Sequence, residues 1–298
     1  MGKNRGTHHK TVGRASIKKS SCGLCGNIRT LTKTHVPPQC AGNAGQVKRF
    51  TVISDDRNQL GRNGQRLGGI HLYGLCADCN SGLQANWDPA YCNFARSLWP
   101  FVFGDGLILA DVRVQMPSVE IFPGAIARSV LASCFALNPN LRSLFRKLAD
   151  DLVASSPSFS LPNDTAMYVG VNRGPQAIVT GSMFGFHFFD RCQDGSPMRT
   201  MSFAQVYFPP LAWQFASVSQ SPLLEHDGWS DVSEWFLRDP TQAEVLNALL
   251  PNLRIVAHPK FDPGASSDWS EMFDRESCFI VRSDNAIATI RAKFDMEC

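Results

Sequence analysis

The sequence has no long uninterrupted apolar segment, and this absence limits where the protein can reside. None of its 298 residues lies in an apolar run that approaches a membrane-spanning helix, which needs roughly 18 residues. The basic N-terminus has no apolar segment either, so it does not resemble a secretory signal. Internal repeats and low-complexity segments are also missing. We therefore expect a cytoplasmic protein that makes no membrane contact.

Acidic residues are missing from the start of the chain, where none occurs before Asp55. Residues 1–100 contain fourteen lysines and arginines against four acidic residues, whereas residues 101–298 contain fifteen against twenty-two. A basic first third attached to an acidic remainder favours contact with a polyanion. Nucleic acid is the partner that we expect, and DNA in particular. A basic tail that only increases solubility is the alternative.

Residues 1–20 show no hydrophobic periodicity and predict a basic, flexible arm that lies along phosphates. More arginines follow in a polar stretch between positions 55 and 69, which predicts a loop. A solvated loop without a partner explains these arginines nearly as well. The candidate nucleic-acid contacts are Lys18, Lys19, Lys33, Arg57, Arg62 and Arg66.

The ten cysteines are distributed unevenly. Four of them form two Cys-x-x-Cys pairs, Cys22 with Cys25 and Cys76 with Cys79. Two such pairs can close a tetrahedral zinc site. A long chain without a secretory signal favours a reducing cytosol and metal ligation over disulfides. We therefore expect these four cysteines to bind one structural Zn²⁺.

A second zinc set uses residues that lie between the two pairs. His35 and Cys40 could replace the second pair, together with Cys22 and Cys25. The six cysteines outside the pairs are scattered, and Cys134 lies in an apolar helical pattern that predicts a core position. The sequence leaves both zinc sets open.

Hydrophobic periodicity divides the first third of the chain into strands and one helix. Pro37 and Pro38 end the first strand just after His35. The helix follows the second cysteine pair, with Asn80 near its N-cap. We assign residues 21–97 to a small zinc domain. Its predicted segments are strands at 28–34, 50–53 and 70–75 and a helix from about Asn80 to Phe94.

Residues 98–298 have the periodicity of a larger α+β domain with a mostly antiparallel sheet. We expect this domain to sense a ligand, bind a partner or recognise the target. A last strand or helix is expected at 286–293. The other predicted strands lie at 107–114, 167–171, 177–189, 201–207, 254–258 and 278–282, and the helices at 123–137, 140–153 and about 230–250.

The order Cys-x-x-Cys, Thr-His-Val-Pro-Pro, then Cys-x-x-Cys-Asn resembles the HNH nuclease family, whose core is a ββα-metal finger. The resemblance covers residues 20–92. It implies that the paired cysteines hold a structural zinc behind the active site. It also implies that His35 is the general base that takes a proton from water. Asn80 would help to hold a catalytic Mg²⁺ or Mn²⁺.

Two positions depart from the family pattern. The residue before the first histidine is usually Asp or Glu, a metal ligand, but here it is Thr34. A hydroxyl is a poorer ligand for a hard cation. The central position of the motif is often Asn but falls on His71, which could orient His35 or bind the divalent ion with Asn80. A buried, structural His71 and a capping Asn80 are the alternatives.

These features predict a metal-dependent HNH-type endonuclease that hydrolyses phosphodiester bonds in DNA, with His35, His71 and Asn80 as its catalytic residues. The resemblance suggests restriction or phage defence as the setting. A zinc module that binds nucleic acid without cutting it, or an adaptor, is the alternative. A single finger makes one nick, so cutting both strands implies a homo-oligomer. An activating ligand or protein partner would act through residues 98–298.

Overall fold

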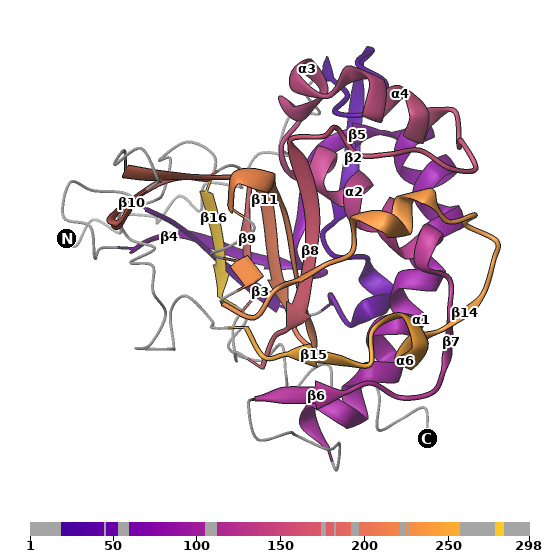
Figure 1. Cartoon of the computed structure of the whole chain (residues 1–298). Coiled ribbons are helices and arrows are strands. Elements are labelled where there is room, and N and C mark those ends of the chain that lie inside the picture. Colours follow the sequence, from indigo (N-terminus) through magenta and orange to yellow (C-terminus); the bar gives the residue numbers. More distant parts are fainter. Residues whose placement is uncertain are drawn as a thin grey trace, which may run out of the picture.

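The structure is a computed structural model. It describes residues 19–44, 46–52, 60–104, 112–173, 177–181, 183–191, 197–220, 224–225, 227–256 and 278–282. Helices pack beside antiparallel sheets (Figure 1), so the expected α+β class is confirmed at this level. A search of the described helices for one with the length and apolar character of a membrane span finds none.

The small sheet contains the region between the cysteine pairs. Its strands are β1 (Lys19–Ser21), β2 (Ile28–His35) and β5 (His71–Cys76), in the order β1-β2-β5 and antiparallel throughout. After β5 comes a π-helical segment, η2 (Asp78–Leu83), which continues into α1 (Gln84–Phe103). The predicted strand, strand and helix are confirmed, but α1 extends nine residues beyond the predicted end at Phe94.

A hairpin is inserted between β2 and β5. It consists of β3 (Gln46–Val52) and β4 (Leu60–Leu67), which pair with each other antiparallel. The loop predicted for 55–69 is wrong at 60–67, which form β4. The sequence pattern missed this strand because its glycine and asparagine residues have low strand propensity. Pairing with β3 supplies the backbone hydrogen bonds that override this local preference.

The hairpin joins a nine-stranded sheet that contains most of the later strands. The order is β13-β8-β12-β11-β9-β16-β3-β4, with β10 paired to β11, and the pairings within it are antiparallel. The one strand predicted at 177–189 is two. The bounds are β8 Thr165–Val171, β9 Ile178–Thr180, β10 Met183–Arg191, β11 Pro197–Phe208, β12 Leu211–Ser217, β13 Ser230–Asp231 and β16 Cys278–Arg282.

Helix α2 (Pro123–Leu137) has the predicted bounds and is buried along its whole length. The helix predicted at 140–153 is instead two helices, α3 (Leu141–Leu144) and α4 (Arg146–Val153). Phe145 separates them with φ −125° and ψ 53°. Its ring packs 4.9 Å from Phe203 and 5.4 Å from Phe215, so packing against the large sheet breaks the helix.

The helix predicted near 230–250 is wrong for most of its length. Asp239 Oδ1 accepts hydrogen bonds from the backbone and hydroxyl of Thr241, a local turn that Pro240 reinforces. Residues 286–293 and most of the strand predicted at 107–114 lie outside the described residues. The described elements here are η4 (Ser233–Leu237), α6 (Leu246–Leu249), β14 (Glu244–Val245) paired with β7 (Glu120–Ile121), and β15 (Asn252–Arg254) paired with β6 (Arg113–Gln115).

The core is continuous between the two sheets. One cluster of buried side chains includes Leu75 of β5, Phe94 of α1, Phe135 of α2 and Trp213 of β12. Helix α1 crosses the predicted domain boundary between residues 97 and 98. The division into domains stays a prediction. The described part of residues 21–97, called the zinc region below, packs directly on the elements that follow it.

Candidate functional site

The four paired cysteines lie together. Their Sγ atoms are all within 4.8 Å of one another, and Cys25 Sγ is 3.8 Å from Cys76 Sγ. A tetrahedral zinc with Zn–S bonds of about 2.3 Å has S–S edges of about 3.8 Å. The arrangement of Cys22, Cys25, Cys76 and Cys79 therefore fits a metal ion such as zinc.

Local structure positions each sulfur. Cys22 and Cys25 follow β1 in a turn, which the N–H of Gly26 closes by donating to the Cys22 carbonyl oxygen. Cys76 ends β5, and its N–H donates to Cys22 Sγ over 3.4 Å. The Cys79 thiol, hydrogen-bonded to Cys22, lowers the pKa of Cys22 well below its ordinary value, whereas the same interaction raises the pKa of Cys79. A thiolate is the form that binds metal.

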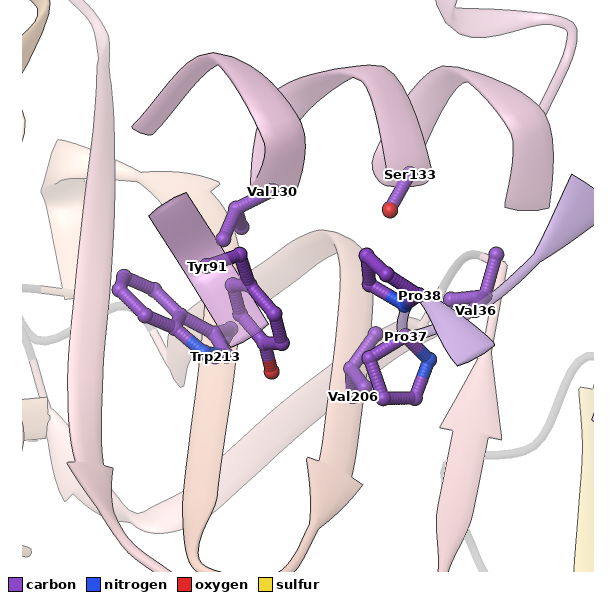
Figure 2. Close-up of a pocket in the computed structure, with 8 residues that line it drawn as sticks. All are labelled: Val36, Pro37, Pro38, Tyr91, Val130, Ser133, Val206 and Trp213. Carbon is purple, nitrogen blue, oxygen red and sulfur yellow. The ribbon is translucent and has the colours of Figure 1, made fainter. Parts of the chain in front are cut away.

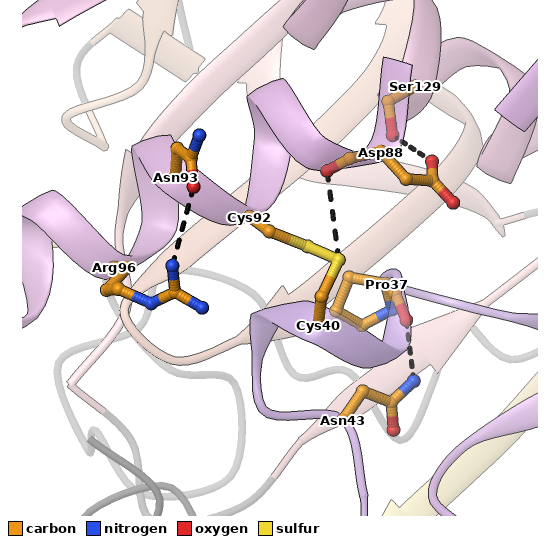
Figure 3. The surroundings of a disulfide bond; sticks show 8 residues. All are labelled: Pro37, Cys40, Asn43, Asp88, Cys92, Asn93, Arg96 and Ser129. Carbon is orange, nitrogen blue, oxygen red and sulfur yellow. Dashed lines mark hydrogen bonds between the residues drawn. A yellow bond between two sulfur atoms is a disulfide. The ribbon is translucent and has the colours of Figure 1, made fainter. Parts of the chain in front are cut away.

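Cys40 and Cys92 form a disulfide that joins η1 (Gln39–Ala41) to α1 (Figure 3). The zinc set containing His35 and Cys40 is therefore wrong, because Cys40 has no free sulfur to bind metal. The expectation of metal ligation over disulfides is also wrong for this pair. The chain brings together two cysteines that are 52 residues apart, and the sequence spacing does not reveal this.

His35 is half-buried at the end of β2. Its Nε2 lies 2.8 Å from the carbonyl oxygen of Gly68. A carbonyl oxygen only accepts hydrogen bonds, so Nε2 carries the proton and Nδ1 of the neutral ring keeps its lone pair. The ring is thus held by one nitrogen while the other can accept a proton.

His71 lies directly opposite His35 in the register of β2 and β5. The ring centroids are 5.7 Å apart, and His71 Nδ1 is 3.1 Å from the carbonyl oxygen of Gly69. Gly68 and Gly69 have φ values of 89° and 80°. Glycine adopts this left-handed backbone without strain. The Gly68-Gly69 pair therefore provides one carbonyl for each histidine, a role that the sequence pattern did not suggest although the pair is visible there.

Asn80 lies inside the π-helical segment, so the N-cap prediction is wrong. Its Nδ2 donates to the carbonyl oxygen of Lys33 over 2.8 Å and to Thr32 Oγ1 over 3.1 Å. Both amide hydrogens are engaged with β2, whereas Oδ1 has no hydrogen-bond donor among the described residues. A fixed amide oxygen of this kind suits a hard cation.

His35 and Asn80 line one open hollow of about 370 Å³. Asp88 of α1 lines it too, although no sequence pattern places this residue in the site. Ser129 Oγ donates to Asp88 Oδ1 over 2.7 Å (Figure 3), and burial raises the pKa of Asp88 to about 6. The lining residues are Lys33, His35, Pro38, Gln39, Cys40, Asn80 and Asp88.

Thr34 does not take part in the hollow. Neighbouring residues of a strand face opposite sides, and the hollow lies on the side of Lys33 and His35. Thr34 is 0% exposed, and its Oγ1 has no hydrogen-bond partner in the described structure. A carboxylate at position 34 would therefore be buried away from the hollow.

The segment after His35 is held by apolar packing (Figure 2). One small space is lined by Val36, Pro37, Pro38, Tyr91, Val130, Ser133, Val206 and Trp213, and Tyr91 lies between the proline segment and Trp213. The space between these side chains is only about 10 Å³. Such a space holds about one water molecule at most. We assign it to packing that fixes the end of β2 and so the position of His35.

The predicted nucleic-acid contacts are only partly described. Lys33 is exposed at the hollow, and Lys19 is exposed in β1 rather than in a flexible arm. Arg62 and Arg66 lie in β4, where the backbone is described. Lys18 and Arg57 lie outside the described residues, as does the rest of the predicted arm. The role of these residues stays a prediction.

Comparisons with models of protein families, with curated proteins and with solved structures found no match.

Proposed function

We propose that this protein is a metal-dependent endonuclease of the HNH type that hydrolyses phosphodiester bonds in DNA. The observation that carries the proposal is the shared hollow of His35 and Asn80, beside a four-cysteine cluster that suits zinc. The order of two antiparallel strands and a helix around this hollow supports the ββα-metal finger that the sequence pattern suggested.

His35 acts as the general base in this proposal. The Gly68 carbonyl holds the Nε2 proton, so Nδ1 takes a proton from water, and the hydroxide attacks the scissile phosphorus in line. The P–O bond to the leaving oxygen breaks, and that oxygen takes a proton from solvent. His71, whose own ring is held by Gly69, packs beside His35 and helps to position it. The exposed Lys33 attracts the phosphate backbone.

A divalent Mg²⁺ or Mn²⁺ would be held by Asn80 Oδ1 at the hollow. When bound, such an ion neutralises the charge that develops on the phosphate and on the leaving oxygen. Cys22, Cys25, Cys76 and Cys79 would hold a structural zinc, which would fix the end of β5 and the start of the helix relative to the turn at Cys22. Asn80 directly follows Cys79, so a zinc bound there would also fix the position of the amide.

Plasmid cleavage tests the proposal. Supercoiled DNA is incubated with Mg²⁺ or Mn²⁺ and the wild type, His35→Ala, Asn80→Ala or Asn86→Ala. Asn86 is an exposed asparagine of α1 and serves as the matched control. We expect His35→Ala to cut at least about 100-fold more slowly while keeping its zinc. Asn80→Ala should also lose activity, and Asn86→Ala should cut at the wild-type rate.

Equal cutting by the wild type and His35→Ala would overturn the role of His35. A non-catalytic zinc module that binds nucleic acid is the second candidate, because Thr34 removes the carboxylate usual before the histidine. Retarded migration of uncut DNA on a native gel, with no nicked product under either metal, would favour that module. Neither cutting nor retardation would favour a protein adaptor.

A further inference from the structure

We infer that Asp88 is an anionic ligand for a hard divalent cation in the hollow, and that it takes over the part a carboxylate at position 34 would play. The inference deepens the proposed function and rests on it for the purpose of the cation. Binding of the cation is measurable without DNA cleavage.

The lining of the hollow singles out Asp88. Among the described lining residues it is the one acidic side chain, and a hard cation prefers anionic oxygens. Ser129 occupies Oδ1, whereas Oδ2 has no hydrogen-bond donor among the described residues. The carboxylate is thus held in place through one oxygen and retains the other for a ligand.

Two further groups of the hollow have the same arrangement. Asn80 is fixed through Nδ2 and retains Oδ1, and His35 is fixed through Nε2 and retains Nδ1. A carboxylate oxygen and an amide oxygen are both suitable for Mg²⁺ or Mn²⁺. The imidazole stays available for water. The hollow therefore offers separate groups for the cation and for the proton.

The spacing along the helix determines how a cation would be held. Asp88 and Asn80 are eight residues apart along η2 and α1, so they lie on different helical turns. Mg²⁺ binds proteins through one or two carboxylates and keeps several waters. We therefore assign a partly hydrated ion between the two residues.

Water and substrate oxygens must complete the coordination of such an ion. Among the described residues, the four cysteines are the one group of three or more His, Cys, Asp or Glu side chains close enough to share a metal. The hollow instead combines one carboxylate with one amide. A cation held in this way binds weakly until phosphate oxygens add to its shell.

Mn²⁺ binding tests the inference. Zinc-loaded full-length protein is titrated with Mn²⁺, and free Mn²⁺ is followed by electron paramagnetic resonance. Asp88→Asn removes the negative charge but keeps an oxygen that accepts the hydrogen bond from Ser129. We expect at least a tenfold loss of Mn²⁺ affinity in this variant. Asp78→Asn is the matched control, because Asp78 is an exposed carboxylate paired with Arg29, and it should bind as the wild type does.

Ser129→Ala separates a metal ligand from a structural carboxylate. This variant loses the hydrogen bond to Asp88 but keeps the charge, so it should retain most Mn²⁺ binding. A wild type that binds no Mn²⁺, or an Asp88→Asn variant that binds it equally well, would overturn the inference. Zinc content and thermal unfolding would detect a loss of zinc or of the folded state in Asp88→Asn. In that case Asp88→Glu, which keeps the carboxylate, takes its place. We expect Asp88→Glu to bind Mn²⁺, and a folded Asp88→Glu that binds none would contradict the inference.

The two proposals fail in different ways. If the wild type binds Mn²⁺ through Asp88 but never cuts DNA, the cation site stands and the nuclease does not. If His35-dependent cleavage occurs while Asp88→Asn binds Mn²⁺ normally, the nuclease stands and the role of Asp88 does not.

Discussion

Three polar side chains of the hollow share one hydrogen-bonding arrangement. His35, Asn80 and Asp88 each use one polar atom in a hydrogen bond, and the other polar atom has no hydrogen-bond partner among the described residues. The bound atom fixes the orientation of the side chain, and the free atom can meet a ligand or a proton. Such preorganisation lowers the reorganisation that a reaction or a ligand requires.

Asp88 makes the folded state sensitive to pH. Burial raises its pKa from 3.8 to about 6. The unfolded chain therefore releases this proton at lower pH than the folded chain does. As pH rises from about 4 to above 6, the contribution of Asp88 to stability falls, by roughly 3 kcal/mol at most.

We predict that Asp88→Asn removes the fall in stability that Asp88 causes as pH rises. Without added Mg²⁺ or Mn²⁺, the variant should unfold at the same urea concentration as the wild type near pH 4 and at a higher one near pH 7.5. Urea titrations at both pH values measure the difference. Asp88→Asn could instead be less stable than the wild type by the same amount at both pH values. That result would show that the carboxylate acts through its hydrogen bond with Ser129 rather than through its charge.

At the scale of elements, the close contact between β5 and α2 decides how the zinc region attaches. A Cβ atom added at Gly74 would overlap the carbonyl oxygen of Ala136, and one at Gly23 would overlap that of Phe135. Glycine at both positions lets the backbones approach directly. The apolar pattern of α2 and Pro123 at its start specify that helix, but its contacts with β5 and with the turn after β1 require Gly74 and Gly23 respectively.

We predict that Gly74→Ala destabilises the protein by about 3 kcal/mol, because backbone lies where the methyl group would be. Gly82→Ala is the matched control, since no atom of the described residues lies within 4 Å of its added Cβ and alanine favours a helix. Chemical denaturation compares the two variants. Similar stability for Gly74→Ala and the wild type would contradict the close contact of β5 with α2.

At the scale of the whole molecule, the zinc region and the larger sheet share one core. Arg142 of α3 donates to the carbonyl oxygen of Leu24 between the first two cysteines, and its side chain lies where a Cβ of Gly26 would be. Loss of the metal should therefore reach beyond the cysteines. Coupling through a continuous core favours a single cooperative transition.

We predict that Cys76→Ser loses zinc and lowers the midpoint of one thermal transition by at least about 10 °C. Cys40→Ser should keep its zinc, because Cys40 is bonded to Cys92 and not to the metal. Elemental analysis and calorimetry measure both effects. Two separate transitions, of which only the smaller responds to zinc loss, would show that residues 21–97 fold independently.

The sequence by itself determined the features that depend on short segments. The two Cys-x-x-Cys turns identified a cluster that can hold metal, and the apolar run of α2 with Pro123 at its start specified a helix with the observed bounds. Alternation and the following prolines placed His35 at the end of β2. In each case neighbouring residues contain the necessary information, because turn geometry and periodicity are local.

Only the tertiary structure decided which distant groups meet. It brought Asp88 to the hollow, turned Thr34 into the core, paired Cys40 with Cys92 and drew β4 into the large sheet. None of these outcomes follows from spacing, because each depends on how α1, α2 and β3 pack. Asp88, which we propose as the carboxylate that the motif lacks at position 34, lines the hollow because α1 packs beside the end of β2 and not because of its place along the chain.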